Sequence, residues 1–262
     1  MVYSFDLNSK IILISGGYGY LGTAIVESLL FHNAIVYILG RSESKFEALL
    51  SSVGCDNKEK LFFEECDISS TDSIKKAYDR IFYREGKIDV LINNAFYSMG
   101  QSPEQMTDEE WKVGIDGTLS SVFRCIREIT PYFKEKKNGK IINVSSMYGM
   151  VSPDFDVYIE FPEFLNPPHY GAAKAGVIQL SKYYASYLGE YGVNVNSVTP
   201  GPFPSRNVQK NTKFIDSLKR KTLLNKIGKP EDLAGIFVFL ASDTSNYVTG
   251  QNMIIDGGWT TK

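Results

Sequence analysis

A tyrosine and a lysine four residues apart, Tyr170 and Lys174, form the pair in this sequence best suited to proton transfer. They lie in a stretch that predicts a helix over 170–191, where residues four apart share one face. A free tyrosine has a pKa of about 10 and is a poor acid–base group at neutral pH. Because a nearby ammonium stabilises a phenolate, we expect Lys174 to lower the pKa of Tyr170. Taken alone, such a pair is usually an ordinary feature of an amphipathic helix.

A glycine-rich turn comes directly after the first apolar run of the chain. Gly16, Gly19 and Gly22 have the spacing G-x-x-G-x-x-G between a predicted strand over 10–15 and a predicted helix over 21–31. Glycine lets a backbone approach a pyrophosphate, and the free N–H groups at the start of a helix favour the anion. The position predicts a dinucleotide site, although a turn that merely needs positive φ has the same pattern. The expected contacts are Ser15, Gly16, Gly19, Tyr20, Leu21 and Gly22.

The end of the second predicted strand bears on the type of dinucleotide. An acidic residue there binds the ribose 2′-hydroxyl of NAD, whereas an arginine accommodates the 2′-phosphate of NADP. This chain has Gly40 in that place, followed by Arg41 and Ser42, both positioned to bind phosphate. We therefore expect NADP ahead of NAD, although the glycine turn itself holds no basic residue and Arg41 can equally be a solvated side chain.

Apolar runs of strand length alternate with amphipathic, helix-length stretches from end to end. The predicted strands cover 10–15, 34–39, 60–65, 88–93, 140–145, 193–198 and 252–255. The predicted helices cover 21–31, 44–51, 70–84, 108–136, 170–191, 212–225 and 230–241. Continuous Val/Ile/Leu runs are typical of strands covered on both faces, as in a parallel sheet. The pattern predicts an α/β, Rossmann-type, doubly wound sheet flanked by helices, with residues 1–262 forming a single domain.

Composition excludes several classes of protein. The chain has 262 residues, of which 43% are hydrophobic and 22% charged, as in ordinary globular proteins. Its net charge of −2 argues against a nucleic-acid or membrane-surface partner held by charge. The three cysteines (Cys55, Cys66 and Cys125) and two histidines (His32 and His169) form no metal-ligand pattern, so we expect no metal. With no signal peptide or membrane-length apolar run, we expect a cytoplasmic protein.

In their order along the chain, the motifs resemble those of the short-chain dehydrogenase/reductase family, and the resemblance covers nearly the whole sequence. Besides the glycine turn, they are Cys66-Asp67-Ile68, Asn93-Asn94-Ala95, Asn143-Val144-Ser145-Ser146, Tyr170-Gly171-Ala172-Ala173-Lys174, Pro200-Gly201, Thr249-Gly250-Gln251 and Asp256-Gly257-Gly258. The resemblance implies seven parallel strands, a nicotinamide cofactor, and hydride transfer between an alcohol and a carbonyl.

The resemblance also implies roles for individual residues. Ser146 would hydrogen-bond the substrate oxygen, Tyr170 would give it a proton as hydride reaches the carbon, and Lys174 would also bind the nicotinamide ribose. Further cofactor contacts would be Asp67, Ile68, Asn94, Ala95, Pro200, Gly201 and Ser205. Read without the family, these are buried strand-end and turn residues.

The sequence departs from the family's pattern near the expected site. The glycine spacing is that of the branch that modifies sugar nucleotides, whereas everything downstream resembles the shorter, single-domain branch. Thr118 stands where the family often has an asparagine that holds a water near the lysine, and Asp116 is a second candidate for that role. Phe96 replaces a usual glycine, and we expect its ring to narrow the site.

Ser146 and Tyr170 lie 24 residues apart, nearly double the family's usual spacing. The excess is the segment 150–168, which is long for a strand–helix loop and carries four acids, Asp154, Asp156, Glu160 and Glu163, without a base. Because both flanking residues must converge on one substrate oxygen, we expect the segment to form a lid over the substrate, although a surface decoration or subunit contact would also explain it. Its carboxylates would repel anionic thioester carriers.

These observations favour an NAD(P)-dependent oxidoreductase that acts on a sugar, sugar acid or polyol-like small molecule. The sugar preference rests on the polar segment and on resemblance to sugar-acid dehydrogenases of the family. An alternative is a 3-oxoacyl thioester (acyl-carrier protein) reductase, which a basic docking patch would favour, and the sequence shows none. A second alternative is a non-catalytic nucleotide-binding sensor. By resemblance, we expect a homo-oligomer, either a tetramer or a dimer.

Overall fold

A seven-stranded parallel sheet forms the centre of the computed structural model, which describes residues 5–54 and 57–261. The strands are β1 (Ile11–Ser15), β2 (Ile35–Gly40), β3 (Leu61–Glu65), β4 (Val90–Asn93), β5 (Gly139–Val144), β6 (Val193–Pro200) and β7 (Asn252–Ile255), in the order β3-β2-β1-β4-β5-β6-β7. Every neighbouring pair is parallel. The predicted fold class, a single-domain doubly wound sheet, is confirmed.

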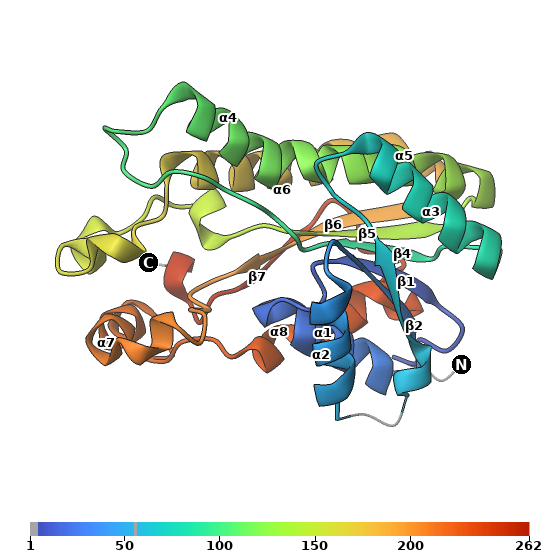
Figure 1. Ribbon diagram of the computed structural model, residues 1–262, viewed down its shortest axis with the longest axis horizontal. Helices are drawn as coiled ribbons and strands as arrows, with labels where there is room; N and C mark the ends of the chain where they lie inside the picture. Colours follow the sequence, from blue (N-terminus) through green and yellow to red (C-terminus); the bar gives the residue numbers. More distant parts are fainter. Residues whose placement is uncertain (1–4, 55–56, 262) are drawn as a thin grey trace.

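Helices cover both faces of this sheet (Figure 1). They are α1 (Tyr20–Phe31), α2 (Glu43–Ser52), α3 (Thr71–Glu85), α4 (Asp108–Ile115), α5 (Ser121–Lys136), α6 (Pro168–Leu188), α7 (Thr212–Lys221) and α8 (Pro230–Ala241). Figure 1 shows α3, α5 and α6 over one face and α1, α2 and α8 over the other. The helix α7 lies outside these two layers, near β7, the edge strand of the sheet (Figure 1).

The continuous apolar runs of the strands are explained by two separate core clusters. In β1 every residue is buried, and successive side chains point to opposite faces of the sheet. Ile12 and Ile14 pack with α1, α2 and α8, whereas Ile11 and Leu13 pack with α3, α5 and α6. Because both faces of such a strand are buried in a core cluster, apolar and polar residues do not alternate along it. This explains why the sequence lacks an alternating hydrophobic pattern at these strands.

The strand order reverses between β1 and β4, which lie side by side in the sheet. Leu13 pairs with Leu91 on one side and with Tyr37 of β2 on the other. From this point the chain winds outward in both directions, so the loops after β1 and β4 diverge. In open α/β sheets, ligands bind in the crevice that this divergence leaves at the carboxyl ends of the strands.

The helices differ in three places from the sequence-based prediction. The predicted helix over 108–136 is divided into α4 and α5 by a π-helical turn at Asp116–Ser120. The helix α6 begins at Pro168, a residue favoured in a first turn, and ends at Leu188, followed by a 3-10 turn over Gly189–Tyr191. The helix α7 ends at Lys221 rather than near residue 225.

Cys66 and Cys125 are free and buried in the structure, and Cys55 lies outside the described residues. Within the described ranges, no group of three or more His, Cys, Asp or Glu side chains is placed to hold a metal ion. Across the same part of the chain, no helix has both the length and the apolar character needed to cross a membrane.

Candidate active site

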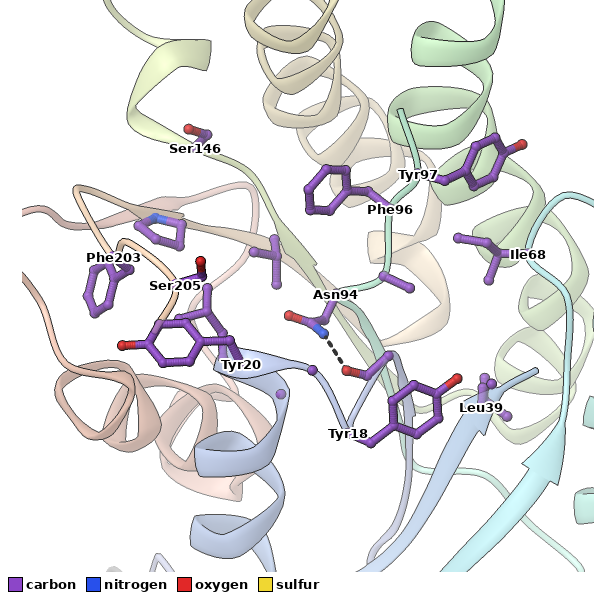
Figure 2. Close-up of a pocket in the computed structure, with 18 of the residues that line it drawn as sticks. Tyr18, Tyr20, Leu39, Ile68, Asn94, Phe96, Tyr97, Ser146, Phe203 and Ser205 are labelled. Atoms are coloured by element: carbon purple, nitrogen blue, oxygen red, sulfur yellow. Dashed lines mark hydrogen bonds between the residues drawn. The ribbon is translucent and has the colours of Figure 1, made fainter. Parts of the chain in front are cut away.

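A cleft of about 540 Å³ lies at the carboxyl ends of the strands, at the reversal between β1 and β4. Its walls come from the turns that follow β1, β2, β3, β4, β5 and β6, and from α6 (Figure 2). The predicted site residues that line it are Gly16, Gly19, Tyr20, Leu21, Gly22, Arg41, Asp67, Ile68, Asn94, Ala95, Ser146, Tyr170, Lys174, Pro200, Gly201 and Ser205. Ser15, Ser42 and Thr118 are not among the lining residues.

The glycine turn leaves its backbone open to the cleft. Gly16 has a φ of +66°, and a Cβ on Gly22 would lie only 2.4 Å from the carbonyl oxygen of Gly16. The helix α1 begins directly afterwards with Gly19 at its N-cap, and its first turn contains no acidic residue. Free N–H groups, close backbone approach and the absence of negative charge fit a pyrophosphate. The residues present therefore fit a dinucleotide.

Ser15 supports this turn from behind instead of lining the cleft. Its side chain is buried, and its Oγ accepts hydrogen bonds from the backbone N–H groups of Asn94 and Ala95, both at 3.0 Å. Figure 2 shows Asn94 reaching toward the glycine turn, where its Nδ2 donates to the carbonyl oxygens of Ser15 (3.0 Å) and Gly16 (3.1 Å). These bonds fix the loop after β4 against the loop after β1.

At the end of β2, a tyrosine covers the position where an acid would bind a ribose. A Cβ on Gly40 would meet the ring of Tyr18, and the hydroxyl of Tyr18 accepts a 3.2 Å hydrogen bond from the backbone N–H of Arg41. The side chains of Arg41 and Lys45 both line this end of the cleft. Ser42 instead caps α2, because its Oγ accepts from the N–H of Lys45 at 3.4 Å.

Asp67, at the same end of the cleft, remains a carboxylate over a wide range of pH. Burial alone raises the pKa of Asp67, but hydrogen bonds from Ser69 and the positive charges of Arg41 and Arg124 outweigh that effect. The pKa of Asp67 therefore lies below its usual value. Oδ1 of Asp67 accepts from both the backbone N–H (2.9 Å) and the hydroxyl (2.8 Å) of Ser69.

Ser146, Tyr170 and Lys174 lie together at the opposite end of the cleft. Lys174 is 3% exposed, and its Nζ donates a 2.7 Å hydrogen bond to the carbonyl oxygen of Val144, the last residue of β5. The hydroxyl of Ser145 donates to the carbonyl oxygen of Lys174 at 2.8 Å. The strand that presents Ser146 is thus joined directly to the helix that presents Tyr170.

The pKa of Tyr170 differs from the expectation that Lys174 would lower it. Burial raises the pKa of Tyr170 above its ordinary value, and only hydrogen bonding to Ser146 acts in the other direction. Burial also lowers the pKa of Lys174 to about 7. The prediction considered the charge of the ammonium without the desolvation of both groups, and desolvation dominates for side chains enclosed in this way.

Phe96 stands beside the tyrosine–lysine pair. Its ring centroid is 5.6 Å from that of Tyr170, and the Nζ of Lys174 lies 5.3 Å from the Phe96 centroid. The phenyl ring lines the cleft while remaining half-exposed. Phe96 therefore forms part of the cleft wall beside Tyr170, and its narrowing of the site stays a prediction.

Thr118 does not line the cleft, and its catalytic role stays a prediction. It is 1% exposed within the π-helical turn, and its Oγ1 has no hydrogen-bond partner. The cleft in this region is lined instead by Tyr97, whose hydroxyl donates to the Asp116 carboxylate. Asp116 also pairs with Arg124, so its charge is compensated inside the protein.

A second cavity, of about 390 Å³, adjoins the first. Ser146, Tyr170, Gly201 and Phe203 line both. The inserted segment 150–168 contributes Tyr158, Glu163, Phe164, Leu165 and Asn166 to its walls, and α7 contributes Phe214 and Leu218. The acidic residues Asp154, Asp156 and Glu160 are not among the lining side chains. The second cavity therefore has apolar walls with a few polar groups.

The inserted segment is packed against the rest of the chain by contacts of three kinds. The ring of Phe164 packs against that of Phe214 in a tilted arrangement, with centroids 4.5 Å apart, and Asp154 forms a 2.5 Å ion pair with Lys221. The side-chain amide of Gln101 donates to the carbonyl oxygens of Glu163 (2.9 Å) and Leu165 (2.8 Å). The segment is consequently an ordered wall of the second cavity.

Comparisons with known proteins agree with this geometry. The family model described as enoyl-(acyl carrier protein) reductase matches residues 20–260. A 3-oxoacyl-[acyl-carrier-protein] reductase of Thermotoga maritima is 32% identical over 260 residues, covering 96% of this chain and 98% of that protein. The chain belongs to the short-chain dehydrogenase/reductase family.

Two solved short-chain dehydrogenase/reductase structures are similar over nearly their whole length. One, from Leptospira borgpetersenii with bound NAD+, is 33% identical with a TM-score of 0.85, covering 99% of this chain and 97% of its own. A gluconate 5-dehydrogenase from Burkholderia cenocepacia, in complex with NADP and tartrate, is 26% identical with a TM-score of 0.87, covering 99% and 98%. Family membership makes this chain an oxidoreductase that uses a nicotinamide dinucleotide.

Several lining residues of this short-chain dehydrogenase/reductase were not found from its sequence. Tyr18, Lys45, Tyr97, Tyr148 and Phe203 all line one of the two cavities. Lys45 carried only a weak signal, a second cation close to Arg41 in the sequence. The aromatic residues carried none, because their types and spacing do not distinguish a cavity wall from a core.

Proposed function

We propose that this chain interconverts a secondary alcohol and a carbonyl compound by hydride transfer. The observation that carries the proposal is that Ser146 and Tyr170 line both cavities at once. A carbonyl group bound in the second cavity would place its oxygen at the two hydroxyls, with its carbon toward the cofactor cleft. A non-catalytic sensor would not need hydroxyl groups that line both the cofactor cleft and the second cavity.

In the direction of reduction, the substrate oxygen accepts hydrogen bonds from Ser146 and Tyr170. When bound, the nicotinamide dinucleotide supplies the hydride. As the C=O π bond breaks and the carbon becomes tetrahedral, negative charge develops on the oxygen, and the O–H bond of Tyr170 breaks to give it a proton. The ammonium form of Lys174 stabilises the resulting phenolate. The reverse sequence, with the phenolate as base, oxidises the alcohol.

For the cofactor we propose NADP ahead of NAD. Arg41 and Lys45 line the end of the cleft that follows β2, where a 2′-phosphate would lie, and Gly40 supplies no carboxylate to repel it. Two cations beside a phosphate form charge-assisted hydrogen bonds that a free 2′-hydroxyl cannot match. The carboxylate of Asp67 lies at the same end, so either dinucleotide can have its adenosine bound there.

For the substrate we propose a sugar, sugar acid or related polyol, with the segment 150–168 as its lid. The second cavity presents polar groups on Tyr148, Tyr158 and Asn166, which can bind hydroxyl groups. The structurally similar gluconate 5-dehydrogenase supports this choice. Charge repulsion by the lid supports it less than expected, because only Glu163 of the four acids lines the cavity.

A 3-oxoacyl thioester reductase is the second candidate, and the structure adds an observation in its favour. Arg206, Lys219, Lys226 and Lys229 line a hollow of about 560 Å³ that also includes Tyr20, and they outnumber its two acids, Glu231 and Asp232. These residues are dispersed in the sequence, so no basic patch was visible there. Such a surface can attract an acidic carrier protein. The similarity to the Thermotoga maritima enzyme agrees with this candidate.

Absorbance of reduced NADP distinguishes these functions. The protein is mixed with NADPH and, in separate reactions, with keto sugars, keto sugar acids and the N-acetylcysteamine thioester of a 3-oxo acid. Preferred turnover of the sugars supports the polyol proposal, and preferred turnover of the thioester supports the second candidate. No consumption with any carbonyl compound, by protein that binds NADPH, contradicts the oxidoreductase proposal and favours a sensor. The cytoplasmic location and the homo-oligomer stay predictions.

A further inference from the structure

Two tyrosine hydroxyls meet inside the second cavity. Tyr148 follows Ser146 by two residues, and Tyr158 belongs to the inserted segment. Both side chains line the cavity and are buried, at 7% and 6% exposure, and their hydroxyl oxygens are hydrogen-bonded to each other. Neither residue takes part in the proton transfer proposed above. Their pairing therefore needs a separate explanation.

Counting donors and acceptors shows that one of the two hydroxyl protons of the pair has no hydrogen-bond acceptor. The side-chain amide of Asn166 donates to the oxygen of Tyr158 at 3.4 Å. If Tyr148 also donates to Tyr158, the proton of Tyr158 has no acceptor, and if Tyr158 donates to Tyr148, the proton of Tyr148 has none. Each hydroxyl has a single proton, so one donor is left over in either arrangement. A buried donor without an acceptor is costly, unless a ligand supplies one.

Both phenols remain donors at neutral pH. Burial raises the pKa of Tyr148, and the neighbouring hydroxyls of Tyr158 and Tyr170 raise it further. Burial likewise raises the pKa of Tyr158, against the hydrogen bonds from Tyr148 and Asn166. The pair therefore offers a neutral O–H group to a ligand and is unsuited to act as a base.

We propose that Tyr148 and Tyr158 together determine substrate specificity by donating a hydrogen bond to a second oxygen of the substrate, apart from the oxygen that reacts at Ser146 and Tyr170. This inference rests on the proposed function. Phe164, Phe214 and Leu218 line the same cavity, and their apolar side chains can accommodate the carbon skeleton. The ligand class is a carbonyl compound with an additional hydroxyl or carbonyl oxygen.

The decisive variant replaces both tyrosines, Tyr148→Phe together with Tyr158→Phe. Removing both partners of a hydrogen bond leaves neither hydroxyl unpaired, so the double variant is expected to fold better than either single one. Tyr132→Phe is the matched control, because it deletes a phenolic hydroxyl that donates to Asp79 outside both cavities. Circular dichroism and thermal unfolding verify that the variants are folded.

The probes are matched pairs of ketones in which one member carries a hydroxyl and the other a methyl group at the same position. 4-Hydroxybutan-2-one and pentan-2-one form one pair, and longer spacers between the two oxygens give further pairs. The ratio of kcat/KM within each pair measures recognition of the second oxygen. Calorimetric titration with and without NADP+ measures the same ratio in binding, with no turnover involved.

For at least one spacer, the wild-type protein and the Tyr132→Phe control should prefer the hydroxyketone by about tenfold, the effect of one neutral hydrogen bond. In the double variant this ratio should fall to near one, with turnover of the methyl ketone retained. A wild-type ratio near one for every spacer, or a ratio unchanged in the double variant, overturns the inference. Failure to reduce any ketone contradicts the proposed function instead, and the calorimetric ratio still decides the role of the pair.

Discussion

Lys174 is bonded to the end of the strand that carries the serine with which it is expected to cooperate. Its Nζ donates to the carbonyl oxygen of Val144, two residues before Ser146, and its own carbonyl oxygen accepts from the Ser145 hydroxyl. This reciprocal pair of hydrogen bonds holds α6 against β5. The relative position of Ser146 and Tyr170 is therefore fixed by the fold before any ligand binds.

The buried position of Lys174 should be detectable in stability. Burial lowers the pKa of Lys174 in the folded state from its ordinary value to about 7. Between pH 7 and 9 the unfolded chain therefore holds a proton on this lysine that the folded protein has lost. Stability rises with pH wherever the unfolded state binds more protons, so this residue contributes a slope of at most about 1.4 kcal/mol per pH unit.

In a Lys174→Met variant this contribution is absent. Urea unfolding at pH 7, 8 and 9 should show a free energy of unfolding that rises less with pH than in the wild type. Lys140, whose pKa burial lowers to about 8, contributes equally to both proteins and cancels in the comparison. Equal slopes in the two proteins would show that Lys174 is charged in the folded state throughout this range.

Tyr170→Phe should abolish turnover while leaving the cofactor bound. The substitution removes the hydroxyl that transfers the proton but keeps the ring, which packs beside Phe96. General acid catalysis contributes about 10²- to 10⁴-fold, and a loss of kcat of that size is expected. Binding of NADPH, followed by its fluorescence, should change little. Tyr83→Phe, which alters a side chain that is 94% exposed, should keep wild-type kcat. Normal turnover in Tyr170→Phe would remove Tyr170 from its proposed role.

The sheet could be predicted from the sequence because strands that are buried on both faces consist mostly of apolar residues. The runs at Ile11–Ser15 and Ile35–Gly40 are almost wholly apolar and buried, as expected for strands covered on both faces. The glycine turn and the strand-end motifs then fall at the carboxyl edge of the sheet by topology alone. Their convergence on one cleft needed no knowledge of side-chain packing.

The properties that the sequence does not predict depend on how deeply a side chain is buried, and the spacing of residues along the chain does not reveal that depth. Tyr170 and Lys174 share a helix face, as expected, but the depth at which that face is buried determines the direction of their pKa shifts. The burial of Thr118 likewise depends on a π-helical turn that the sequence does not reveal, and its role stays a prediction. The second cavity joins residues from the turns after β5 and β6, the inserted segment and α7, and a contact among such distant segments has no periodic signature in the sequence.

The two cations beyond β2 should control the choice of dinucleotide. Arg41→Ala and Lys45→Ala are each expected to weaken NADP binding by about tenfold or more, because each removes a charge-assisted hydrogen bond to the 2′-phosphate. NAD affinity should be unchanged, since that phosphate is missing. Calorimetric titration with both dinucleotides measures the two dissociation constants.

Added salt provides a second measure of the same charges. Salt screens the attraction between the two cations and the 2′-phosphate, so it should weaken NADP binding to the wild type more than to either variant. Each variant has already lost one of the two cations. Lys75→Ala, which removes an exposed cation of α3 outside the cleft, is the control and should leave both affinities unchanged. Equal loss of NADP and NAD affinity in Arg41→Ala would indicate a role in binding the adenosine common to both.

The inserted segment should depend on Gln101 for its position over the second cavity. The amide nitrogen of Gln101 donates to the carbonyl oxygens of Glu163 and Leu165, so Gln101→Ala leaves this part of the segment without its link to the loop after β4. We expect a several-fold rise in KM for the carbonyl substrate, because part of the binding energy must now order the segment. Affinity for the dinucleotide should stay the same, since Gln101 does not line the first cavity.

Limited proteolysis gives a readout of this effect that is independent of activity. Cleavage within 154–166 should be faster in Gln101→Ala than in the wild type, because local opening costs less free energy there. Gln251→Ala is the matched control: its amide also donates to a backbone carbonyl, that of Thr249, but outside both cavities. A wild-type cleavage rate together with an unchanged KM in Gln101→Ala would show that the ring contact with Phe214 and the ion pair of Asp154 hold the segment without help from the amide.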